Sequence, residues 1–210
     1  MINVLIADDH ALIREGLKKI LKNEPDMTLA GEARNVQELN DQLGKLAVDI
    51  VLLDISMPGE SGLDALKNLK QQNAHLPILI LSVHPEHRFA IRALKAGASG
   101  YITKESAVEE LVQAIRKIVA GGKYVSLALA EQLATELEAG KDKPLHEMLS
   151  DREYQVMCMI ASGKKSTEIA EELSLSLSTV NTYRARIFEK MKLQSNVDLT
   201  RYAIENHLIE

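Results

Sequence analysis

An aspartate stands directly behind a short apolar run in the first half of the chain. Residues 50–53 are apolar and include β-branched side chains, which predicts a strand buried on both faces, and Asp54 follows at once. The Met57-Pro58-Gly59 segment then predicts a turn. A carboxylate at the C-terminal end of a parallel strand lies where open α/β sheets bind ligands. Because Asp is also a common turn former, Asp54 alone does not separate a chemical role from a structural one.

Four more polar side chains end or follow other apolar runs, and they are Asp8, Asp9, Ser82 and Lys104. Three carboxylates close together repel one another, so they can hold a hard cation such as Mg²⁺, or one of them can accept a phosphoryl group as a nucleophile. A lysine and a hydroxyl beside them could bind the phosphoryl oxygens. The alternative is an ion pair between Lys104 and an aspartate, with no chemistry.

The elements that must position these residues alternate between strand and helix five times over residues 1–122. The strands are expected at 2–7, 27–32, 50–53, 77–82 and 100–103, the second of them half-polar and near a sheet edge. Ser106 and Glu109 predict a capping box for the last helix, and Gly121-Gly122 its end. Such alternation predicts a doubly wound five-stranded parallel sheet, in which all strand C-termini share one edge. The polar side chains should therefore converge there.

These motifs resemble the receiver domain of two-component response regulators, a flavodoxin-like fold, over residues 1 to about 122. The resemblance rests on Asp8-Asp9, Asp54-Ile-Ser-Met-Pro-Gly, Ser82 and Gly100-Tyr-Ile-Thr-Lys104. It implies that Asp54 accepts a phosphoryl group from a sensor histidine kinase. It implies Mg²⁺ as cofactor, with ligands that are drawn from Asp9, Asp54, the Ser56 carbonyl and, partly through water, Asp8.

The same resemblance also implies which residues respond when Asp54 is phosphorylated. It implies that Ser82 and Lys104 bind the phosphoryl group, and that Tyr101 turns inward as Ser82 is drawn to it. An ordinary edge-strand tyrosine is the alternative for Tyr101. Glu105 stands where many receivers have proline after the lysine, and a cis bond before a non-proline residue would cost about 3 kcal/mol.

Residues 123–145 break the alternation and are expected to form a linker. Leucines at 127, 129, 133 and 137 predict one helix, and the polar segment 139–144, with its Gly and Pro, predicts a hinge.

Residues 146–210 are expected to form a small all-α domain of four short helices. Ser150 with Glu153 predicts a capping box, Ser166 and Ser176 predict the next two N-caps, and the last helix begins near Asn196. The middle pair, with its tight turn, has helix-turn-helix proportions.

One face of the helix that starts at Leu177 is small and polar near its N-terminus. At 100° per residue, Val180, Ile187 and Met191 share the side expected to be buried. The opposite side, which suits the DNA major groove, carries Ser178, Asn181, Thr182, Ala185 and Arg186. Charge supports DNA binding only locally: residues 146–210 hold eight Lys and Arg against ten Asp and Glu, whereas residues 178–192 hold four cations against one Glu. The alternative interpretation, an ordinary solvent-exposed face on a helical module that does not bind DNA, stays open.

A second resemblance, to the LuxR-type helix-turn-helix, identifies the chain as a member of the NarL/FixJ subfamily of response regulators. It rests on Leu149-Ser-Asp-Arg-Glu-Tyr, Gly163-Lys-Lys-Ser-Thr-Glu-Ile-Ala, Leu175-Ser-Leu-Ser-Thr-Val and Tyr183-Arg-Ala-Arg-Ile. It implies a transcription regulator that binds double-stranded DNA as a homodimer. Base contacts are implied for Asn181, Thr182 and Ala185, and phosphate contacts for Lys164, Lys165, Thr179, Tyr183 and Arg186.

Composition limits the rival functions. A net charge of −5 gives no global attraction to DNA or to anionic membranes. The single cysteine, Cys158, excludes an internal disulfide. Because neither a leader peptide nor an apolar membrane span is expected, the sequence predicts a cytoplasmic location without membrane contact.

A P-loop NTPase is excluded among the rival functions, because Cys158 stands where the P-loop motif would need Gly. An aspartyl-phosphate hydrolase would need a further acid–base group, so we expect no enzyme beyond the receiver's own phosphotransfer and dephosphorylation. A phospho-switch that binds protein or RNA remains the other rival.

Overall fold

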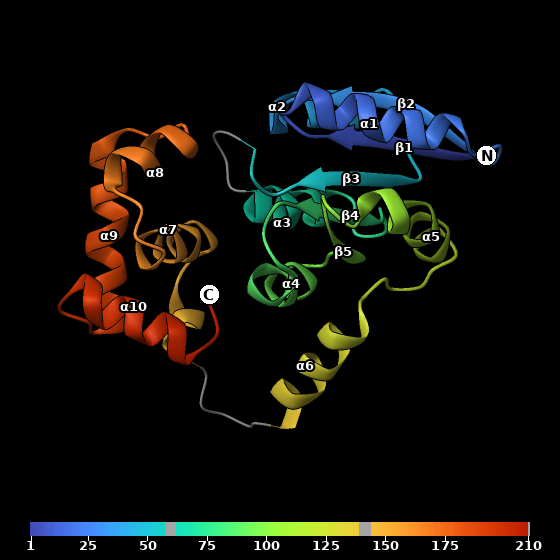
Figure 1. Ribbon diagram of the computed structural model, residues 1–210. Coiled ribbons are helices and arrows are strands. Elements are labelled where there is room, and N and C mark those ends of the chain that lie inside the picture. The colour runs from blue at the N-terminus through green and yellow to red at the C-terminus, as the bar shows by residue number, and fades with distance from the viewer. Residues whose placement is uncertain (58–61, 139–143, 210) are drawn as a thin grey trace. The chain divides into compact units, whose positions relative to one another are not determined.

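The computed structural model describes residues 1–57, 62–138 and 144–209 (Figure 1). They form two compact units, Met1–Leu133 and Ala134–Glu210. The turn expected at Pro58 and Gly59 and most of the hinge expected at 139–144 lie outside the described residues. Within the described parts, no helix combines the length and apolar character that crossing a bilayer requires.

The first unit contains one all-parallel sheet, as the alternation predicted. Its strand order is β2-β1-β3-β4-β5, so the half-polar strand β2 stands at an edge, as expected. The apolar runs give strands buried by helices on both sides, and Ile50, Leu52 and Leu53 are fully buried. The strands are β1 (Ile2–Ala7), β2 (Met27–Ala33), β3 (Ile50–Asp54), β4 (Ile78–Ser82) and β5 (Gly100–Thr103).

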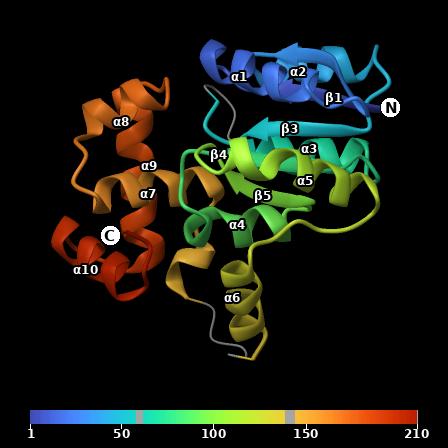
Figure 2. The same cartoon turned by 45° about the vertical axis from the view of Figure 1, so that its right-hand side comes forward.

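Helices cover both faces of this sheet (Figures 1 and 2). Helices α1 and α5 pack together on one face, where Leu17, Leu21, Leu111 and Ile115 share a buried cluster with the sheet. The helices of the unit, in order, are α1 (Ala11–Lys22), α2 (Val36–Leu43), α3 (Gly62–Gln72), α4 (Glu86–Lys95) and α5 (Ala107–Val119). Helix α6 (Leu127–Glu138), expected in the linker, begins in this unit and ends in the next.

The capping box predicted at Ser106 is wrong. Ser106 precedes α5, but its backbone is helical and its side chain accepts no cap hydrogen bond. Its Oγ instead donates to the Thr103 carbonyl at 3.3 Å, and its backbone N–H donates to Thr103 Oγ1 at 3.2 Å. The turn after β5 therefore occupies the side chain that a cap would need. In the same turn, the Lys104–Glu105 peptide bond is trans.

Beyond the end of α6, the described residues of the second unit form four α-helices and one short 3-10 turn. Its core includes Met157, Ile169, Val180, Ile187 and Leu199. The elements are η1 (Leu145–Met148), α7 (Asp151–Ala161), α8 (Ser166–Glu172), α9 (Leu177–Met191) and α10 (Asn196–Glu205).

The predicted caps of this unit hold in two of three cases. Ser150 and Glu153 form the expected capping box, and Ser176 Oγ accepts from the Thr179 N–H at 3.1 Å. Ser166 is not a cap but the first helical residue of α8. The capping position belongs to Lys165, whose N–H donates to Glu168 at 2.7 Å.

Candidate functional site

Lys104 joins two of the predicted aspartates at the C-terminal edge of the sheet. Its Nζ lies 2.6 Å from Asp54 Oδ2 and 2.7 Å from Asp8 Oδ2, and both carboxylates are fully buried. Asp54 ends β3 and Asp8 follows β1, while the Lys104 N–H donates to the Ser82 carbonyl at 2.8 Å and so ties the ends of β4 and β5 together. The parallel topology thus brings side chains from the ends of β1, β3 and β5 together beside the end of β4.

Burial dominates the electrostatics of this cluster. It raises the pKa of the Asp54 carboxyl above its usual value, and the repulsion from Asp8 adds to this, although Lys104 acts in the opposite direction. Burial also works against the charge on Lys104, but Asp54 and Asp8 together raise the pKa of Lys104. The lysine is therefore held fully charged, and it compensates Asp54 only in part.

The donor set fits a hard divalent cation. Asp8, Asp9, His10 and Asp54 each place one ligand atom within 4.8 Å of the others. Carboxylate oxygens are the ligands that Mg²⁺ prefers in proteins. Asp9 Oδ1 is buried at this edge and lies 2.9 Å from His10 Nδ1. Ser56 lies beside them, since its N–H donates to Asp54 Oδ1 at 2.8 Å.

Sequence reasoning missed two side chains that border this cluster. His10 Nδ1 lies 2.9 Å from Asp9 Oδ1, and its place directly after Asp8-Asp9 was a usable signal. Arg14 is buried and donates from Nη1 to the Asp8 carbonyl at 2.8 Å, a contact that only the turn from β1 into α1 creates.

Ser82 and Tyr101 meet at the loop between β4 and α4. The Ser82 Oγ accepts from the His84 N–H at 3.0 Å, and the Tyr101 hydroxyl donates to the His84 carbonyl at 2.9 Å. Burial raises the pKa of Tyr101, so its hydroxyl stays a donor. The Tyr101 side chain therefore points inward, toward His84 in the loop that follows Ser82. His84 was not predicted, because its role is carried by backbone atoms.

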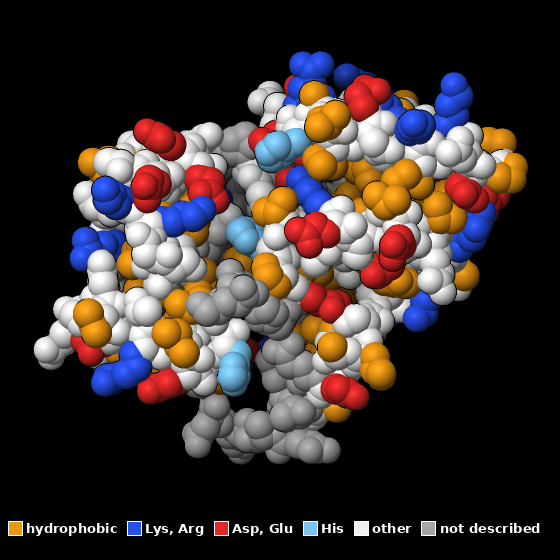
Figure 3. Space-filling model, in the orientation of Figure 1, with side chains coloured by type: hydrophobic (Ala, Val, Ile, Leu, Met, Phe, Trp, Pro, Cys, Tyr) orange, Lys and Arg blue, Asp and Glu red, His pale blue; other side chains and the backbone are white. Residues whose placement is uncertain are grey.

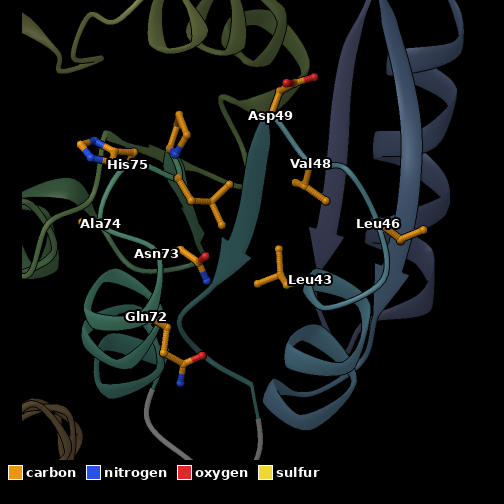
Figure 4. A pocket seen from close by; sticks show the side chains of 10 residues that line it. Leu43, Leu46, Val48, Asp49, Gln72, Asn73, Ala74 and His75 are labelled. Carbon is orange, nitrogen blue, oxygen red and sulfur yellow. The ribbon is translucent and has the colours of Figure 1, made fainter.

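A separate cavity lies at the opposite end of the sheet. It has a volume of about 630 Å³, and Leu43 and Val48 point into it while His75 lies at its rim (Figure 4). None of the predicted site residues lines it.

In the second unit, α9 presents the predicted polar face. Val180, Ile187 and Met191 are buried, as the angular pattern required. The exposed positions include Ser178, Asn181, Thr182, Ala185 and Arg186. A shallow depression on this face is lined by Ser178, Thr179, Thr182, Tyr183 and Arg186. The face is therefore free of core contacts over its first three turns.

Two of the cations counted for this surface are engaged within the domain. Lys164 forms an ion pair with Glu172, and Lys190 lies 2.6 Å from Glu153 on α7. Glu153, which lies far from this segment in the sequence, therefore compensates one of the positive charges counted for residues 178–192.

Comparisons with known proteins agree with both units. Residues 4–116 match the family model described as the response regulator receiver domain, and residues 147–203 match that described as bacterial regulatory proteins, luxR family. The chain is 40% identical over 209 residues to response regulator UvrY of Escherichia coli strain K12, which covers 99% of this chain and 96% of that protein. It is 38% identical over 212 residues to response regulator GacA of Pseudomonas aeruginosa, covering 100% and 99%.

Among solved structures, one aligns with this chain over both of its domains. RcsB from Salmonella enterica serovar Typhimurium, bound to a promoter in the presence of the phosphomimetic BeF₃⁻, superposes with a TM-score of 0.61 at 26% identity. The match covers 96% of this chain and 97% of that one. A further structure in the same group is titled as a complex of the response regulator RcsB with DNA, with a TM-score of 0.60.

Proposed function

From the premise that this chain belongs to the NarL/FixJ response regulators, the DNA-binding regulators of two-component systems, we propose that phosphorylation of Asp54 by a sensor histidine kinase switches it. The observation that carries the proposal is the position of Lys104, whose ammonium lies 2.6 Å from Asp54 Oδ2. A phosphoryl group on an Asp54 oxygen would lie beside this ammonium, and the Ser82 hydroxyl would bind it as well. The chain thus supplies charge and hydrogen-bond donation around the transferred group.

In the transfer itself, an Asp54 oxygen attacks phosphorus and the bond from phosphorus to the kinase histidine breaks. Lys104 stays charged and compensates the transferred oxygens. Asp8, Asp9, Asp54 and the Ser56 carbonyl are the groups we propose to hold Mg²⁺. When bound, that ion supplies positive charge to the carboxylates and the phosphoryl oxygens. We propose no other enzymatic activity than this phosphotransfer and the later loss of the phosphoryl group.

The switch that we propose runs through the loop between β4 and α4. Drawing Ser82 toward the phosphoryl group moves the backbone of His84, to which both Ser82 and Tyr101 bond. The phosphoryl group must bind one arrangement of this loop better than the other to shift the population. The new positions of Ser82 and Tyr101 would then shift the face made by α4 and α5.

An apolar groove beside Lys104 supports a protein as phosphodonor. It lies between α1 and α5, has a volume of about 210 Å³ and is lined partly by Leu12 and Val108, whose exposed fractions are 84% and 73%. Hydrophobic side chains gather over these helices in the space-filling view (Figure 3). Exposed apolar side chains clustered at a groove are typical of protein contact sites. We propose that the kinase domain carrying the phosphohistidine docks here.

For the second unit we propose that α9 enters the major groove of double-stranded DNA. Asn181, Thr182 and Ala185 would face bases, and Lys164, Lys165, Thr179, Tyr183 and Arg186 would lie near phosphate. Ser178 would belong to the same DNA-binding face. The exposed polar face of α9 supports this assignment. We further propose a cytoplasmic homodimer on two-fold sites, with a receiver at 1–122, a linker at 123–145 and a DNA-binding domain at 146–210.

The experiment that tests the phosphoryl switch is an intact-mass measurement after incubation with acetyl phosphate and Mg²⁺. We expect one phosphoryl group on the wild-type chain, and none on Asp54→Asn or without the metal. DNA affinity is then compared between the two forms. Phosphorylation of Asp54→Asn at the wild-type level would refute the assignment of Asp54.

A further inference from the structure

The chain that follows α5 returns to the edge of the sheet and lies beside β5. Gly100 and Tyr124 form a parallel bridge, and the Tyr124 N–H donates to the Ser99 carbonyl at 3.0 Å. A Cβ on Gly100 would lie 2.7 Å from the Tyr124 carbonyl oxygen, so glycine is required for this close approach. The Tyr124 hydroxyl donates to Glu110 on α5 at 3.0 Å. The chain is therefore fastened to the edge of the sheet before α6 begins.

One hydroxyl joins the start of α6 to the start of α4. Ser126 Oγ accepts from the Leu129 N–H at 3.0 Å, and the Ser126 carbonyl accepts from the Ala130 N–H at 3.0 Å, so Ser126 caps α6. The same hydroxyl donates to Glu86 Oε2 at 2.5 Å, and Glu86 is the first residue of α4. A serine hydroxyl can donate one hydrogen bond while it accepts others, so the cap of α6 and the bond to α4 form together.

Glu86 lies next to the loop through which the proposed switch acts. His84 holds Ser82 through its N–H and Tyr101 through its carbonyl. Only Pro85 separates His84 from Glu86, and the proline ring fixes one backbone angle of that connection. A shift of the His84 backbone therefore moves the start of α4, and Glu86 moves with it.

We propose that Glu86 and Ser126 are positioning residues that pass the movement of this loop to α6, and that phosphorylation of Asp54 breaks the bond between them. The inference rests on the proposed function, because the movement begins when Ser82 is drawn toward the phosphoryl group. A hydrogen bond to a carboxylate is stronger than one between neutral groups, so its loss removes a strong restraint on α6. The first turn of α6 is then held only by its own cap, and it opens more often.

Hydrogen exchange of the full chain, measured with and without acetyl phosphate and Mg²⁺, tests this coupling. Exchange of the Leu129 and Ala130 amides should rise about fivefold when the wild-type chain is phosphorylated, because opening of the first turn of α6 exposes them. In Ser126→Asp, the aspartate still caps α6 but repels Glu86. In this variant and in Glu86→Ala, phosphorylation should change the exchange by less than about 1.5-fold. The matched control Glu109→Ala, which removes an exposed carboxylate from the first turn of α5, should respond as the wild type does.

A conservative variant separates coupling from a purely structural role. Ser126→Thr keeps the hydroxyl and should retain the wild-type response. A purely structural bond would raise exchange in Ser126→Asp and Glu86→Ala equally with and without phosphorylation, and would leave the phosphorylation-dependent change intact. That result, or unchanged exchange in wild-type chain that intact mass shows to be phosphorylated, would overturn the inference and leave the phosphoryl switch standing. Absence of any phosphoryl group on the wild-type chain would instead refute the proposed function, and the inference with it.

Discussion

Replacing Asp54 by Asn should stabilise the metal-free receiver, even though it removes an ion pair. Asp54 Oδ2 lies 2.6 Å from Lys104 Nζ, worth about 6 kcal/mol of attraction at an effective dielectric constant of about 20. Asp8 and Asp9 have oxygens no more than 4.8 Å from Asp54, and at this upper limit each repels it by about 3.5 kcal/mol, which makes about 7 kcal/mol the smallest combined repulsion. These terms nearly cancel. The cost of burying the Asp54 charge is then left uncompensated.

The substitution leaves the surroundings intact. An Asn side chain can still accept from the Ser56 N–H, and Lys104 keeps Asp8 as a partner at 2.7 Å. We expect the free energy of unfolding of the receiver to rise by about 1–2 kcal/mol, which raises its melting temperature by about 3–6 °C. Thermal unfolding in the presence of a chelator measures this. Asp41→Asn, which removes the same charge from an exposed position on α2, should change the melting temperature by less than about 1 °C.

The pH dependence of this difference has a defined sign. Burial raises the pKa of Asp54 in the folded protein above its unfolded value, so folding favours the protonated carboxyl. The destabilisation of the wild-type chain is therefore present above the folded pKa, and is lost as pH falls through it toward the unfolded value. The advantage of Asp54→Asn should shrink over that range. A melting temperature below that of wild type at neutral pH, or an advantage that grows on acidification, would refute the crowded-carboxylate reasoning.

Other consequences follow from the same contacts. Lys104→Met should lower the free energy of unfolding by about 3–5 kcal/mol in denaturant titrations, because it leaves two buried carboxylates without their partner; an unchanged midpoint would contradict this. Leu12→Ala should slow phosphotransfer from the kinase several-fold but not phosphorylation by acetyl phosphate, and equal effects on both would argue against docking at the groove. Arg186→Ala should weaken DNA binding and reduce the salt slope by about one, whereas the matched variant Arg201→Ala on α10 should not; identical slopes for the two would count against α9 as the DNA-reading helix.

Local sequence patterns determine much of the fold. The apolar runs before Asp54 and Ser82 are strands whose ends lie within one residue of the predicted ones, and their alternation with helices was enough to predict a parallel sheet. Since parallel strands share one carboxyl edge, the convergence of Asp8, Asp54 and Lys104 followed from topology alone. The buried side of α9 followed from the helical period. Patterns with a period of two or 3.6 residues survive folding because the backbone imposes them.

The tertiary structure decided the contacts between side chains that are distant in sequence, and it decided between competing local partners. Ser106 bonds to Thr103 rather than capping α5, because both arrangements use the same hydroxyl and the turn after β5 selects one. Lys190 pairs with Glu153, 37 residues away, and so cannot be counted from sequence as a free charge. Burial of Asp54 outweighs its ion pair only because the sheet removes it from water. Residue types set which interactions are available, and packing sets which of them form.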